Sequence, residues 1–67
     1  MKPRRYAVAI DAEGKVLVCE QQTRCPADAP EVDVYPGVAS VPTWVNLWAE
    51  DEHEAQGEAM KAWEVMG

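Results

Sequence analysis

The side chains of residues 5–11 alternate between large apolar groups and small or charged ones, starting with Tyr6. A period of two is typical of a β-strand with one buried face. Gly14 follows in a short polar stretch, where a tight turn favours a residue that adopts positive φ. Residues 16–19 then resume an apolar run. The pattern predicts a β-hairpin over residues 5–21.

Two further segments separate this hairpin from the next apolar region. Residues 22–30 contain two prolines among small and polar side chains, which predicts a loop. Residues 31–35 alternate again and predict a short strand. Pro36 and Gly37 end it, and a proline at this point suits a strand at the edge of a sheet.

The segment 43–50 allows two interpretations. As a strand, it sets Trp44 and Trp48 on the face away from its aliphatic side chains. As the start of a helix, it would have Thr43 as its N-cap. We favour the strand because the segment is rich in β-branched and aromatic residues, and because a better helix start follows at Asp51.

Residues 51–66 have the features of an amphipathic helix. Asp51 is followed three residues later by Glu54, the spacing of a capping box. At 100° per residue, Gly57 falls on the exposed side. The small and apolar side chains gather within one arc of about 100°, and they are Ala55, Ala59, Ala62, Trp63 and Met66.

Together these elements predict one small domain over residues 1–67 with an α+β fold. We expect an antiparallel sheet of three to four strands, with one C-terminal α-helix packed on one face. A hydrophobic content of 48% is sufficient for a core. The chain has no apolar run of about 18 residues, the length that a membrane span needs. It also lacks the pattern of a signal peptide, so we expect a cytoplasmic protein.

The residues that could support catalysis or metal binding are few. The chain has two cysteines, Cys19 and Cys25, which is too few for a domain of this size that is stabilised by disulfide bonds. We therefore expect both to be reduced thiols. His53 and Ser40 are the only residues of their types, and no motif around them indicates an activated nucleophile. The two cysteines are six residues apart, wider than in a zinc knuckle. We therefore predict no enzyme activity, no metal and no cofactor.

Charge is distributed unevenly along the chain, whose net charge is -6. Through Cys25, five basic residues oppose three acidic ones, a net charge of +2. After Cys25, nine acidic residues are opposed only by Lys61, a net charge of -8. Such a chain repels nucleic acids and anionic membranes and is attracted to basic protein surfaces. The charge predicts a protein partner, with no direct contact to nucleic acid or membrane.

Two sets of residues are candidates for binding this partner. The first is a run of carboxylates, which could bind a basic protein groove in place of the phosphates of a nucleic acid. The same carboxylates could instead be solvated and serve only to stabilise the start of a helix. The second is the pair Trp44 and Trp48, which would mark an interface with a partner or a second copy if their sheet face is uncovered. They could instead pack beneath residues 36–42 or the helix. The carboxylates are Glu50, Asp51, Glu52, Glu54 and Glu58.

The short length, the strong acidity and the strand-rich pattern with one helix resemble phage-encoded anti-CRISPR proteins. This is a likeness of class over the whole chain, without a shared motif. It implies a stoichiometric inhibitor that binds a nucleic-acid-handling host complex, above all a CRISPR effector, through a DNA-mimicking acidic face. The five carboxylates named above would form that face.

The chain also resembles HicB-type antitoxins in a different set of features. These are a first strand that begins with Tyr6, a turn that contains Gly14, a second strand, and a helix with the pair Glu54 and Ala55. A further strand-like segment around Pro36 departs from the antitoxin pattern. This resemblance implies a small regulatory binding module that forms homodimers through an exposed tryptophan face.

Overall fold

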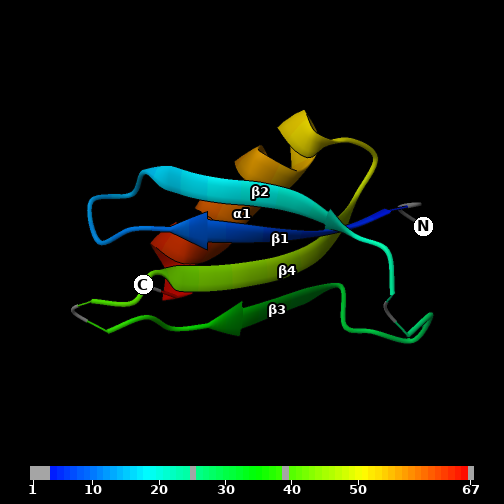
Figure 1. The fold of residues 1–67 in the computed structure, drawn as a ribbon, viewed down its shortest axis with the longest axis horizontal. Coiled ribbons are helices and arrows are strands. Elements are labelled where there is room, and N and C mark those ends of the chain that lie inside the picture. The colour runs from blue at the N-terminus through cyan, green and yellow to red at the C-terminus, as the bar shows by residue number, and fades with distance from the viewer. Residues whose placement is uncertain (1–3, 25, 39, 67) are drawn as a thin grey trace.

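Four strands and one helix make up the protein. A computed structural model describes residues 4–24, 26–38 and 40–66, and of Met66 only the backbone. The strands pair antiparallel in the order β2-β1-β4-β3, and α1 crosses one face of the sheet (Figure 1). The predicted α+β class is confirmed. The elements are β1 (Arg4–Ile10), β2 (Val16–Gln22), β3 (Val32–Tyr35), β4 (Thr43–Ala49) and α1 (Glu52–Met66).

The predicted hairpin is confirmed as β1 and β2, and Asp11 organises its turn. The carboxylate of Asp11 accepts hydrogen bonds from the backbone N–H groups of Glu13 and Lys15, at 2.9 and 2.8 Å. Gly14 adopts a φ of +86°, which residues with a side chain rarely adopt. A Cβ atom at Gly14 would also lie 3.2 Å from the ring of Trp63, so the turn packs against the end of α1.

The preferred strand interpretation of residues 43–50 is confirmed. β4 pairs with β1 along its whole length, from Ile10 opposite Thr43 to Arg4 opposite Ala49. On its other side β4 pairs with β3, so β4 lies inside the sheet. β3 forms an edge of the sheet, in agreement with the proline that follows it.

The core lies between the sheet and α1. Ala55 and Ala59 have no exposed surface, and their small size allows the helix to approach the strands closely. Trp63 packs at the far end of the same arc. The side chain of Met66 lies outside the described residues. The largest fully buried side chains come from the two central strands, and they are Val8, Ile10, Val45 and Leu47.

No described element covers the face of the sheet opposite α1, which we call the open face. Residues that are directly opposite in an antiparallel pair share a face, so the register assigns its members. Ala9 is only 1% exposed there because it lies beside larger neighbours, among them its partner Trp44. The open face consists of Arg5, Ala7, Ala9, Val18, Glu20, Gln22, Asp33, Tyr35, Trp44, Asn46 and Trp48.

Candidate binding surfaces

Four of the five predicted carboxylates lie where β4 turns into α1, and Glu58 lies one helical turn after Glu54; we call the five together the acidic corner. Four of them are exposed, and Glu54 is half-buried. Glu58 forms a surface ion pair with Lys61, at 3.6 Å between Nζ and Oε1. An exposed pair of this kind contributes little stability. The members of the acidic corner are Glu50, Asp51, Glu52, Glu54 and Glu58.

Two members of the acidic corner hold the start of the helix. Asp51 Oδ1 accepts the backbone N–H of Glu54 at 2.8 Å, which is an N-cap bond. Glu54 Oε1 accepts the backbone N–H of Glu50 at 3.4 Å. The reciprocal bond of the predicted capping box therefore forms one residue earlier than the motif implies. These carboxylates have a structural role besides their charge.

Replacing Asp51 by alanine is expected to lower the free energy of unfolding by about 1 kcal/mol, since an N–H group of the first turn loses its acceptor. Asp51→Asn is the matched control because its side-chain oxygen still caps the helix while its charge is removed. Thermal unfolding of both variants separates the two contributions. An equal loss in both would mean that the charge, rather than the cap, stabilises this helix start.

The uneven charge of the sequence is not preserved as two separate regions in space. β1 lies between β2 and β4, and Arg4 is directly opposite Ala49, next to Glu50. Arg5 is likewise opposite Trp48. The start of β1, the 23–31 loop and the β4–α1 turn gather at one end of the sheet (Figure 1). The backbone of Arg4 therefore lies beside the first residue of the acidic corner, while the side chain of Arg5 packs against Trp48 and Pro30.

The two predicted tryptophans lie on the open face and are half-buried. Trp48 packs against the 23–31 loop, because its indole N–H donates to the carbonyl of Ala29 at 3.2 Å. The guanidinium of Arg5 lies over the Trp48 ring, 5.3 Å from its centroid, within the range of a cation–π interaction. Trp44 lies between Ala9 on β1 and Tyr35 on β3. Their position opposite α1 excludes packing beneath the helix.

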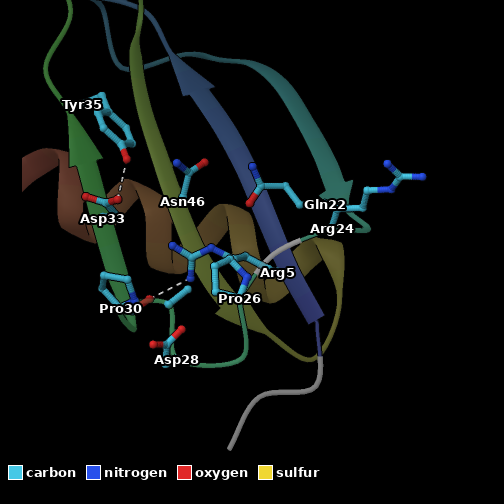
Figure 2. A pocket seen from close by; sticks show the side chains of 10 residues that line it. Arg5, Gln22, Arg24, Pro26, Asp28, Pro30, Asp33, Tyr35 and Asn46 are labelled. Atoms are coloured by element: carbon cyan, nitrogen blue, oxygen red, sulfur yellow. Dashed lines mark hydrogen bonds between the residues drawn. The ribbon is translucent and has the colours of Figure 1, made fainter.

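A pocket of about 410 Å³ is hollowed into the open face beside the 23–31 loop, and we call it the Arg5 pocket. Figure 2 looks onto it with α1 behind the strands. Arg5 is only 5% exposed, and its Nη1 donates to the carbonyl of Pro30 at 2.7 Å. The lining residues are Arg5, Gln22, Arg24, Pro26, Asp28, Ala29, Pro30, Asp33, Tyr35 and Asn46.

Two hydrogen-bonded side chains, those of Asp33 and Tyr35, line one side of the Arg5 pocket. The hydroxyl of Tyr35 donates to Asp33 Oδ2 at 2.6 Å (Figure 2). This hydrogen bond and the negative charge of Asp33 raise the pKa of Tyr35 above its ordinary value, and the positive charge of Arg5 partly opposes them. Tyr35 therefore remains a neutral phenol at neutral pH, with Asp33 as its acceptor.

Among the candidate catalytic and metal-ligating residues, Cys19 lies against the first turn of α1, with its Sγ 4.0 Å from the carbonyl oxygen of Glu52. Burial, followed by the charge of Glu52, raises the pKa of Cys19, which disfavours the reactive thiolate at neutral pH. His53 and Ser40 are exposed, and Cys25 lies outside the described residues. Within residues 4–24, 26–38 and 40–66, no three His, Cys, Asp or Glu side chains form a possible metal site. The absence of enzyme activity and of a cofactor stays a prediction.

The sequence did not indicate the Arg5 pocket, although it did indicate both neighbouring tryptophans. The only local signal was the proline-bracketed loop, whose path across the sheet cannot be inferred from its composition.

Among the described helices, none is long and apolar enough to cross a membrane. Comparison with protein-family models, with curated proteins and with solved structures finds no match to this chain.

Proposed function

We propose that the chain is a binding module without catalytic activity, which regulates a protein partner by holding it against the open face. The observation that carries this proposal is the set of residue types gathered there. Arginine, tyrosine and tryptophan are enriched among the residues that dominate binding energy at protein interfaces. Four such side chains lie on this one face: Arg5, Tyr35, Trp44 and Trp48.

The exposure of the open face supports the same proposal. Tyr35 is 53% exposed and Val18 is 40% exposed, at opposite edges of the face. The half-buried tryptophans lie between them on β4. A partner that covered this face would remove apolar surface from water while polar groups remained at the rim, as in a typical interface.

The acidic corner supports a second candidate function, a DNA-mimicking inhibitor of a phage type that binds a nucleic-acid-handling host complex such as a CRISPR effector. The observation that favours it is the exposure of four carboxylates on a segment fixed by the Asp51 cap. A fixed backbone lowers the entropy that binding must remove. The positive charge of Arg4, whose backbone lies opposite Ala49 at the edge of this corner, counts against this second candidate.

The two candidates predict opposite effects for two double variants. Val18→Lys with Trp44→Ala alters the open face, and Glu52→Lys with Glu58→Lys alters the acidic corner without touching the capping residues. Each tagged protein captures partners from bacterial lysate, with and without nuclease, and mass spectrometry identifies them. We expect the open-face variant to bind the recovered partner about 30-fold more weakly, equivalent to about 2 kcal/mol, and the corner variant to bind normally.

Thermal unfolding shows whether each variant is still folded, and light scattering gives the mass of the wild-type protein. Loss of binding in the corner variant alone would replace our proposal with the DNA-mimic function. A dimer that the open-face variant abolishes would identify the partner as a second copy of the chain, as the antitoxin resemblance implies.

A further inference from the structure

Arg5 is a buried cation that no carboxylate neutralises within the described part of the chain. Its side chain is 95% buried, as its 5% exposure shows. Asp28 and Asp33 line the same pocket, yet the one ion pair formed among the described residues joins Glu58 and Lys61. Buried charges in proteins are usually paired, because removing a charge from water is costly. The floor of the Arg5 pocket therefore holds a guanidinium without a direct ion-pair partner, while the two aspartates of the lining balance the charges of Arg5 and Arg24 over the pocket as a whole.

The guanidinium retains donors that a ligand can reach. A guanidinium carries five N–H donors, and the hydrogen bond of Arg5 to Pro30 occupies only one nitrogen, Nη1. Among the described residues, no fully buried side-chain polar atom lacks a partner. The other nitrogens of Arg5 therefore keep a small exposed surface, although the residue as a whole is only 5% exposed. The Trp48 ring on one side and the Pro30 carbonyl fix the orientation of the guanidinium plane.

The pocket lining favours a singly charged anion. A fixed guanidinium binds carboxylates and phosphates through two parallel hydrogen bonds. Asp28 and Asp33 add two negative charges to the lining, and Arg24 adds one positive charge. A phosphate with two negative charges would be repelled by both aspartates, whereas a carboxylate meets about half of that repulsion. The chemistry therefore fits a carboxylate better than a phosphate.

The remaining lining residues match the groups that flank the carboxylate at the end of a polypeptide. Asn46 and Gln22 carry side-chain amides, which can donate to a carbonyl and accept from an N–H group. Asp28 is an additional acceptor for an N–H group. Pro26 and Pro30, both on the 23–31 loop, add apolar surface to the lining (Figure 2). A small carboxylate without peptide groups would leave these amides unused.

We propose that the Arg5 pocket binds the C-terminal carboxylate of a polypeptide, with Arg5 as its main recognition residue. The inference rests on the proposed function, because the pocket forms part of the open face, and it names the chemical group of the partner that this face recognises. A partner that ends in the pocket would place its preceding residues across the open face, where Trp44 and Tyr35 are available for contact.

The test follows the Arg5 Nε–H and Trp48 indole N–H signals by NMR during titration with acetyl-trialanine. We expect the peptide with a free carboxylate to shift both signals, and its C-terminal amide to bind about tenfold more weakly, because hydrogen bonds to a charged group are lost. Acetate and inorganic phosphate are titrated in parallel. Equal binding of the acid and the amide would overturn the proposal. Acetate binding as tight as that of the peptide would also overturn it, in favour of a small carboxylate.

Matched variants test the assignment to Arg5. Arg5→Lys keeps the charge but loses the two parallel hydrogen bonds, so we expect at least about a fivefold weaker binding of the free acid. Arg4→Lys is the control, because Arg4 is exposed and projects from the opposite face of β1. If Arg5→Lys does not fold, Gln22→Ala, at the rim of the pocket, is expected to weaken binding in its place. Unchanged binding in both pocket variants would overturn the proposal.

The experiment separates failure of this inference from failure of the proposed function. If the acid and the amide bind equally while the open-face variant still loses its partner, the open face binds a partner without recognising a chain end. If the acid binds selectively while the open-face variant keeps its partner, the pocket recognises a carboxylate but the open face is not the partner surface.

Discussion

Replacing Leu47 by alanine is expected to lower the free energy of unfolding by about 2–5 kcal/mol. Leu47 is 1% exposed and lies on β4 between the sheet and α1, so truncation leaves a cavity that neighbouring strands cannot close. A chain of this size has a total stability of roughly 3–10 kcal/mol, at about 0.05–0.15 kcal/mol per residue. We therefore expect the melting temperature to fall by about 10 °C or more, measured by circular dichroism.

Leu17→Ala provides the matched control, because Leu17 is the only other leucine of the chain and is 52% exposed. Its truncation removes the same atoms but creates no cavity, and we expect a change within about 0.5 kcal/mol. Similar losses for both leucines would contradict the position of Leu47 in the core. Such a result would also argue that the surface around Leu17 is covered in solution.

Gly37→Ala is expected to destabilise the protein by about 3 kcal/mol, near the upper end of the effects of overpacking. A Cβ atom at Gly37 would collide with the carbonyl oxygen of Val41 and lie 2.6 Å from the carbonyl carbon of Pro42. Both are backbone atoms, so no side-chain rotation relieves the collision. The loop would have to open, which also breaks the 3.1 Å hydrogen bond from the Gly37 N–H to the Thr43 hydroxyl.

Gly57→Ala makes the same chemical change at a site with free space. No atom lies within 4 Å of a Cβ atom at Gly57, which is exposed in the middle of α1. Alanine favours a helix interior over glycine by about 0.5–1 kcal/mol, so we expect Gly57→Ala to raise the melting temperature. Denaturant unfolding of both variants tests the pair. A neutral Gly37→Ala would mean that the loop over residues 36–42 is not closed as described.

The strands and the helix could be predicted because their signals are local. The alternation that starts at Tyr6, the glycine at the turn and the cap at Asp51 each depend on neighbours within a few residues. The strand interpretation of residues 43–50 was harder, since a helix start at Thr43 has local support. Pairing with β1 and β3 decides this segment, and pairing partners are far away in the sequence.

The candidate binding surfaces were predictable only in part. The position of Trp44 and Trp48 on the face opposite α1 followed from the alternation of β4. The contact of Trp48 with Ala29, and the burial of Arg5 beside Pro30, require the 23–31 loop to cross the end of the sheet. Nothing in the composition of that loop specifies this path. The proximity of Arg4 to the acidic corner likewise depends on the strand order.

The strand order has a consequence for how the chain reaches this fold. The two central strands, β1 and β4, are far apart in the sequence, and their pairing brings Arg4 opposite Ala49. Closing so long a loop loses chain entropy before the first core contacts compensate for it, and folding slows as contacts become less local. The β1–β2 hairpin can form early because its turn is short and Asp11 fixes it. We therefore expect docking of β4 together with α1 onto that hairpin to be the slow step, which would complete the core and the open face together.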